Sequence, residues 1–129
     1  MLTLADYFMG RDLLHPAELT PSLRSNAVCT VERTNALLRL TGIRGCTVNS
    51  GWRPTAINAS IENASPRSRH ITCQAIDLCD EYDTLDAWCM ANLPVLEAIG
   101  LWLEHPSATP GWCHVQTVPP GSGRRVFFP

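Results

Sequence analysis

Two residues seven positions apart, His70 and Asp77, constrain this chain more than any other feature of its sequence. Asp77 lies within the short apolar run Ala-Ile-Asp-Leu, and a third residue of similar chemistry, His114, follows in the segment Gly-Trp-Cys-His-Val-Gln. Two imidazoles and one carboxylate suit zinc, and three protein ligands leave the fourth tetrahedral position open, as in catalytic zinc sites. The sequence therefore predicts a zinc centre built from His70, Asp77 and His114.

The period of a β-strand indicates how these residues could meet. If residues 74–79 form a strand, Asp77 faces a cleft while its apolar neighbours face the core. Residues 112–116 alternate in the same way, with His114 on one face. Antiparallel pairing of the two strands would place Asp77 beside His114, and the preceding loop would supply His70.

The remaining pattern predicts an α+β fold, with a small, mostly antiparallel sheet and flanking helices. Apolar residues recur at helical intervals over residues 22–41, after the start signal Thr20-Pro21 and before Gly42. Residues 84–99 form a second helical pattern, kinked or split near Pro94. The expected strands are residues 47–49, 74–79, 101–104 and 112–116, with the apolar end 126–128 docking on the sheet.

Length and composition are those of one globular domain. The chain has 129 residues, of which 45% are hydrophobic and 17% charged, so we expect a single domain over residues 1–129. The formal charge of -2 argues against a nucleic-acid partner. No run approaches the ~18 apolar residues of a membrane span. We therefore expect a monomeric protein that has no membrane-spanning segment.

Three motifs in order support a family resemblance. Ser-Gly-Trp-Arg at residues 50–53 precedes Ser-x-His-x-x-Cys-x-Ala-x-Asp at residues 68–77, and Trp-Cys-His-Val follows at residues 112–115. The set resembles the D-alanyl-D-alanine peptidase branch of the zinc peptidases that include lysostaphin and the hedgehog signalling domain. That branch has Ser-Gly-Tyr-Arg, Ser-x-His-x-x-Gly-x-Ala-x-Asp and an aromatic-x-His-Val strand. The match covers about half the chain, from Ser50 to Gln116.

The resemblance implies a zinc metallopeptidase that cuts a peptide bond in bacterial peptidoglycan, as a carboxypeptidase or an endopeptidase. It implies that His70, Asp77 and His114 are the zinc ligands and that Arg53 and Ser68 contact substrate. The planar guanidinium of Arg53 suits bidentate binding of a carboxylate. Ser68 has two open interpretations, because its hydroxyl could bind substrate or could shape the loop that delivers His70.

The general base departs from the family pattern. Many relatives place a glutamate or histidine two or three residues before the last ligand, where this chain has Gly111 and Trp112. The nearest carboxylate is Glu104, and a hairpin between residues 101–104 and 112–116 would bring it back to the zinc site. We therefore expect Glu104 to be the catalytic base, with His105 as the alternative.

Six cysteines occur without a Cys-x-x-Cys spacing, and we expect them to be buried free thiols. Cys73 occupies the family's glycine position. It is either a small side chain in place of that glycine or a thiolate that competes for zinc. The acidic turn at residues 80–83 is expected to be solvated and to supply the cap of the next helix; calcium is the less favoured interpretation.

The N-terminus shows neither a basic n-region nor a long apolar h-region, so no Sec-type signal peptide is expected. Both ends of the chain resemble those of small phage or prophage peptidases. This resemblance implies an endolysin-like enzyme, made in the host cytoplasm, that acts on the cell wall after release. The alternative hypothesis is a zinc-containing, non-catalytic module that either binds the cell wall or serves as an interaction module of the virion.

Overall fold

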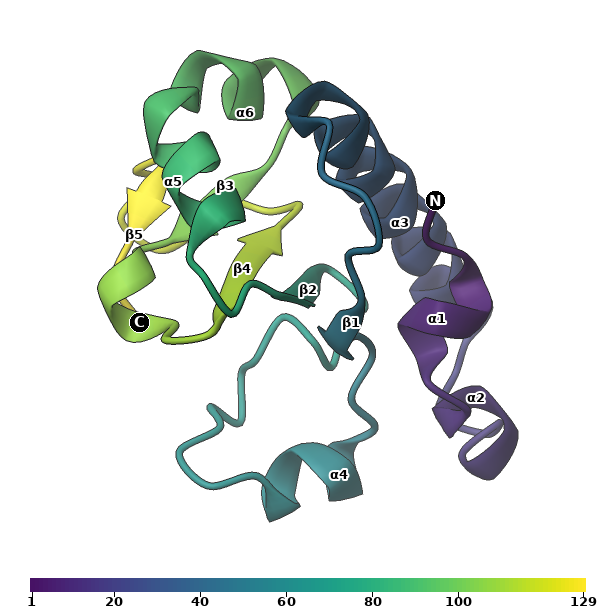
Figure 1. Cartoon of the computed structure of the whole chain (residues 1–129). Helices are drawn as coiled ribbons and strands as arrows, with labels where there is room; N and C mark the ends of the chain where they lie inside the picture. The colour runs from purple at the N-terminus through teal and green to yellow at the C-terminus, as the bar shows by residue number, and fades with distance from the viewer.

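A computed structural model describes all residues from Met1 to Pro129. Helices and strands alternate irregularly along the chain (Figure 1). The helices are α1 (Leu4–Phe8), α2 (Arg11–Leu14), α3 (Pro21–Thr41), α4 (Thr55–Ser60), α5 (Thr84–Ala91), α6 (Leu93–Ile99) and the short 3-10 helix η1 (Pro106–Ala108). The strands are β1 (Val48–Ser50), β2 (Ala75–Cys79), β3 (Trp102–Glu104), β4 (Trp112–Gln116) and β5 (Val126–Phe127).

The five strands form one sheet in the order β1-β2-β4-β3-β5. Every neighbouring pair is antiparallel except β3 and β5, which are parallel. The predicted α+β class with a mostly antiparallel sheet is therefore confirmed. The two strands that carry predicted ligands, β2 and β4, pair in the centre of the sheet, with Asp77 opposite His114.

Local sequence signals explain the longest helix, α3. The hydroxyl of Thr20 accepts the backbone N–H of Leu23, and Pro21 occupies the first helical position. Gly42 ends the helix with a φ of 71°, a conformation that favours glycine. The predicted helix is thus confirmed, and it contacts α1 and α6 (Figure 1).

The second helical pattern divides into α5 and α6 as the proline predicted. The break is at Asn92, and Pro94 lies in the first turn of α6. The acidic turn does cap α5, because both oxygens of Asp80 accept backbone N–H groups, from Leu85 and Asp86. The formal N-cap residue, Asp83, contributes no side-chain hydrogen bond.

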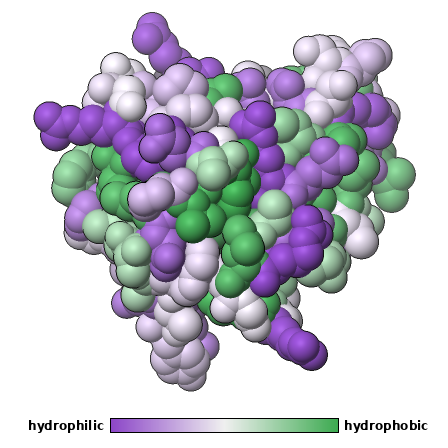
Figure 2. All heavy atoms as spheres, turned by 90° about the horizontal axis from the view of Figure 1, so that it is seen from above, coloured by the Kyte–Doolittle hydropathy of each residue, from purple (hydrophilic) through white to green (hydrophobic).

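The core lies between the sheet and the helices. It contains Tyr7, Phe8, Leu37, Trp52, Ile76, Leu78, Leu96, Leu103 and Val115, among other buried residues. Ile76 and Leu78 are fully buried on either side of Asp77, as strand alternation predicts. Figure 2 shows an apolar patch near the middle of one face of the molecule, bordered by hydrophilic residues. None of the helices combines the length and apolar character that crossing a membrane requires.

All six cysteines are free thiols, but the prediction that they are buried is wrong for half of them. Cys79 is exposed, and Cys29 and Cys46 are only half-buried. Cys79 ends β2 on the same side as Asp77, which faces away from the core. Cys73 is fully buried with a φ of 58°, a left-handed conformation that explains why glycine would suit this position.

Candidate metal centre

His70, Asp77 and His114 converge at one point, where a ligand atom from each lies within 4.8 Å of the others. Asp77 comes from the middle of β2 and His114 from the middle of β4, and the two are direct register partners. His70 comes from the loop before β2. The structure therefore assembles a possible metal-binding triad from the three residues that the sequence singled out.

The ring orientation of His70 is fixed by the backbone. Its Nδ1 lies 2.8 Å from the carbonyl oxygen of Gly51, which can only accept a hydrogen bond, so Nδ1 carries the proton. Nε2 is then left as the free ligand atom, and it lies 3.3 Å from Oδ1 of Asp77. Burial lowers the pKa of His70, which favours the neutral form that a metal ion binds.

His114 presents Nδ1 to the centre, whereas His70 presents Nε2. Its Nδ1 lies 2.7 Å from Oδ1 of Asp77, while Nε2 lies 3.2 Å from Oε1 of Gln116. Gln116 is itself oriented, since its Nε2 donates to the carbonyl of Val118. Burial acts to lower the pKa of His114, but the hydrogen bond and charge of Asp77 outweigh it, so the pKa is raised. A metal ion would therefore compete with a proton at Nδ1.

Gln116 is a residue of the candidate centre to which sequence reasoning gave no role. Strand alternation placed it on the same face as His114, but it was assigned no role. Its contact resembles the outer hydrogen bonds that commonly orient metal-binding histidines. The alternation was the only signal available, because the amide geometry depends on the turn that follows β4.

Asp77 is held as a carboxylate by several contacts. Burial acts to raise its pKa, but the charges and hydrogen bonds of His70 and His114 outweigh burial, so the pKa is lowered. Nη2 of Arg53 also lies 3.2 Å from Oδ2 of Asp77, and Nε of Arg53 donates to the hydroxyl of Ser50. Arg53 thus orients a predicted ligand, in addition to its predicted role in substrate binding.

Two imidazoles and one carboxylate are ligand types that zinc accepts, and one of the distances between them matches a tetrahedral zinc ion. Two ligand atoms at about 2.1 Å from a tetrahedral zinc lie about 3.4 Å apart. The distance of 3.3 Å between His70 Nε2 and Asp77 Oδ1 agrees with that spacing. The 2.7 Å contact between His114 and Asp77 is a hydrogen-bond distance, which would lengthen when a metal ion replaced the proton.

Glu104 reaches the centre through the predicted hairpin. It ends β3, which pairs with β4, and its Oε2 lies 3.8 Å from Nδ1 of His114. The side chain is half-buried, and burial raises the pKa of this carboxyl group. His105 is held differently, because its Nδ1 lies 2.8 Å from the hydroxyl of Ser107 and its ring stacks on Phe128. Of the two predicted bases, only Glu104 lines the cleft at the centre.

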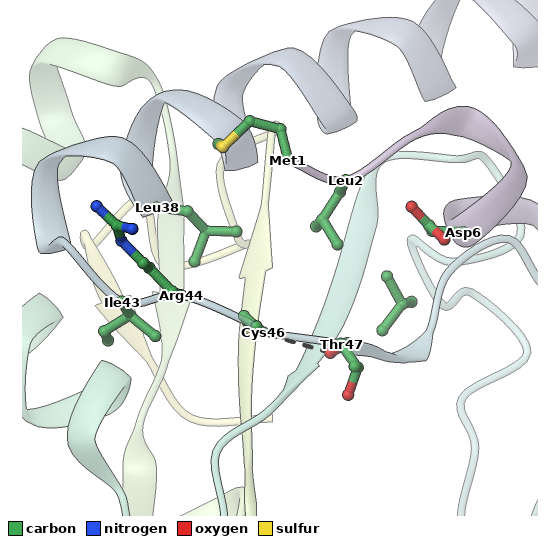
Figure 3. Close-up of a pocket in the computed structure, with 10 residues that line it drawn as sticks. Met1, Leu2, Asp6, Leu38, Ile43, Arg44, Cys46 and Thr47 are labelled. Carbon is green, nitrogen blue, oxygen red and sulfur yellow. Dashed lines mark hydrogen bonds between the residues drawn. The ribbon is translucent and has the colours of Figure 1, made fainter.

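The triad opens into a cleft with a volume of about 740 Å³. Ser68 lines this cleft, and its hydroxyl accepts the backbone N–H of His70 at 3.3 Å, so it shapes the loop that delivers this ligand. A second cleft, of about 530 Å³, lies between the N-terminal segment and the end of α3 (Figure 3). Leu2, Leu38 and Ile43 line it, and no triad residue does.

No protein-family model, no curated protein and no solved structure matches the chain. The geometry of the centre and the resemblance of its motifs are therefore the grounds for assigning a function.

Proposed function

We propose that the protein is a zinc metallopeptidase that hydrolyses a peptide bond in bacterial peptidoglycan, with the fold of the hedgehog and D-alanyl-D-alanine peptidase superfamily. One observation carries the proposal: a histidine-aspartate-histidine triad opens into a cleft, with the carboxyl group of Glu104 at its edge. This combination is typical of a catalytic metal site with an open position. The proposed setting is that of a phage or prophage lysis enzyme, acting on the wall after release.

His70, Asp77 and His114 would hold the zinc ion. Bound there, zinc would supply a Lewis acid that polarises the substrate carbonyl and would lower the pKa of water from 15.7 to about 7. Burial raises the pKa of Glu104, which makes its carboxylate a stronger proton acceptor and so supports its role as the base.

Glu104 takes a proton from the attacking water and passes it to the leaving amine. The water oxygen forms a bond to the carbonyl carbon, and the carbon–nitrogen bond breaks. The products are one carboxylic acid and one amine, so each cut consumes one water molecule.

Two observations support a role for Arg53 in holding the substrate. Its side chain lines the cleft, and although Nε and Nη2 have partners within the protein, Nη1 has none. A guanidinium has five N–H donors, so several remain for a carboxylate of the wall peptide. Arg53 would thereby fix the peptide relative to the reacting carbonyl group, while keeping Asp77 oriented toward the zinc.

The experiment that tests the proposal measures free amines released from purified peptidoglycan. Activity should disappear after chelation and return with stoichiometric zinc. Fragment masses would identify the bond, since a carboxypeptidase releases single amino acids and an endopeptidase opens cross-links. If stoichiometric zinc binds but no amine is released, the enzyme proposal fails. Sedimentation with insoluble peptidoglycan would then test the alternative hypothesis of a wall-binding module.

A further inference from the structure

A second group of acidic side chains lies at the start of α5, outside the metal centre. Asp80, Asp83 and Asp86 each bring a carboxylate oxygen within 4.8 Å of the others. Asp80 and Asp86 are buried, whereas Asp83 is exposed. None of the three lines the cleft of the triad, and no basic side chain forms an ion pair with any of them. Three like charges are thus gathered without a positive partner.

Asp86 is the member of this group that points to a ligand. Its side chain is 1% exposed, and its Oδ1 is buried without a hydrogen-bond partner. Its other oxygen, Oδ2, accepts the hydroxyl of Thr109 at 3.3 Å. The carboxyl group faces the other two, because one of its oxygens lies within 4.8 Å of an oxygen of Asp80 and of Asp83. Buried polar atoms rarely lack a partner, and a bound cation would supply the one that is missing here.

Asp80 keeps lone pairs for a cation even though it caps α5. Its two oxygens accept one backbone N–H each, from Leu85 and Asp86. A carboxylate has about four lone-pair sites, so about two remain. Asp83 adds an exposed carboxylate that forms no cap hydrogen bond, and water can reach the group from its side. Helix capping therefore explains the position of Asp80 but not the convergence of the other two carboxyl groups.

The charges of this group oppose one another unless a cation lies between them. Burial and the charges of Asp80 and Asp83 raise the pKa of Asp86 to about 6. Calcium takes about six to eight oxygen ligands in a flexible geometry, and carboxylates and water are among the usual ones. Zinc sites instead usually include nitrogen or sulfur ligands, which this group does not offer. Its chemistry therefore differs from that of the triad.

We infer that Asp80, Asp83 and Asp86 form a second metal site, which binds Ca²⁺ with water completing the coordination. Magnesium suits the group less, because it requires a nearly ideal octahedron. With only three protein side chains as ligands, the expected Kd is about 10⁻⁴–10⁻³ M. The inference is independent of the proposed function, because it uses no residue of the triad or of its cleft.

The site would join α5 to the two central strands of the sheet. Asp80 directly follows β2, and its backbone N–H donates to the carbonyl of Gly111, next to the start of β4. Asp86 lies in the first turn of α5 and is bonded to Thr109, in the same segment before β4. An ion held by both aspartates would therefore fix the helix against the ends of the strands that carry Asp77 and His114, and it should stabilise the fold.

The test measures Ca²⁺ binding and thermal stability, in buffer freed of other divalent cations and with one equivalent of zinc added. Equilibrium dialysis should find one Ca²⁺ per chain. The melting temperature should rise by about 3–8 °C at about 5 mM Ca²⁺. Because zinc is present from the start, the triad is not the site that Ca²⁺ occupies.

Two variants and one control locate the ion. Asp83→Asn should weaken Ca²⁺ binding by about 10-fold or more while the protein stays folded, since this exposed side chain forms no cap hydrogen bond. Asp86→Asn should abolish the rise in melting temperature. Glu81→Gln removes a charge from the same turn at an exposed residue outside the group, so binding and stabilisation should both persist.

Three results would overturn the inference. They are the absence of bound Ca²⁺ at about 5 mM, an equal stabilisation by NaCl at the same ionic strength, which would indicate charge screening, and binding that survives in Asp83→Asn and Asp86→Asn. If Asp86→Asn does not fold, Asp83→Asn decides the matter. A protein that binds Ca²⁺ here but releases no amine from peptidoglycan would fail the peptidase proposal and still support this one.

Discussion

Gly51 supports His70 from a position where the backbone of Tyr7 leaves no room for a side chain. The carbonyl oxygen of Gly51 accepts a hydrogen bond of 2.8 Å from Nδ1 of His70. A Cβ atom on Gly51 would lie 1.9 Å from the carbonyl oxygen of Tyr7. That same oxygen accepts the backbone N–H of Trp52. The first helix therefore determines where a carbonyl group that orients a metal ligand can lie.

Replacing Gly51 by alanine should damage both stability and metal binding. Relief of the clash requires the backbone to move, at a cost of about 1–3 kcal/mol in the free energy of unfolding. The same movement displaces the partner of His70, so zinc affinity should fall by about 10-fold or more. Urea unfolding and zinc titration measure the two effects. Gly121→Ala is the control, because a Cβ there has no atom within 4 Å; equal behaviour of the two variants would contradict the prediction.

Gln116→Leu should weaken zinc binding by about 10- to 100-fold while the protein stays folded. The substitution removes the acceptor that holds Nε2 of His114 and leaves the ring free to turn. Competition with a chromogenic chelator measures the affinity. Gln74→Leu serves as the control, because Gln74 bonds to Thr72 rather than to a triad residue. An unchanged affinity in Gln116→Leu would show that the contact does not orient His114.

Glu104→Gln should lower kcat by about 10²- to 10⁴-fold with stoichiometric zinc retained, because the amide cannot accept the proton of water. His105→Ala should keep most of the activity, since its ring nitrogen is bound to Ser107 outside the cleft. Amine release and bound zinc are measured on the same samples. The reverse pattern, with loss only in His105→Ala, would assign the base to His105.

The titration of Asp86 should lower the free energy of unfolding as the pH rises. Burial raises the pKa of Asp86 from 3.8 to about 6, and its Oδ1 is buried without a hydrogen-bond partner. The folded state therefore holds the proton more tightly than the unfolded state. The contribution of Asp86 to the free energy of unfolding is greatest below 3.8, the pKa in the unfolded state. It is lost as the pH rises from there to about 6, the pKa in the folded state.

Asp86→Asn stays neutral throughout that range, so it should become progressively more stable relative to wild type as the pH rises from about 4 to about 7. Urea unfolding at several pH values measures the difference. Glu81→Gln, a change at an exposed residue of the same acidic turn, should show no such trend. Parallel stability curves for wild type and Asp86→Asn would mean that Asp86 does not titrate as described.

The sequence by itself determined the elements whose signals are local. The cap at Thr20, the break before Pro94 and the period of two around Asp77 each depend on residues within one or two turns of the chain. Alternation on two strands was also sufficient to predict that Asp77 would lie beside His114, because a one-residue slip would turn apolar side chains out of the core.

Only the tertiary structure decided how these residues act on one another. The close approach of Tyr7 to Gly51, and the pairing of Arg53 with Asp77, join segments distant in sequence. The ring nitrogen that each histidine presents depends on its contact with Gly51 or Gln116. Strand alternation put Gln116 on the face of His114, but it could not show that the amide oxygen reaches Nε2. Secondary structure follows from short-range sterics and burial, whereas hydrogen bonds at the centre require atoms from several elements to be placed within about 3 Å of one another.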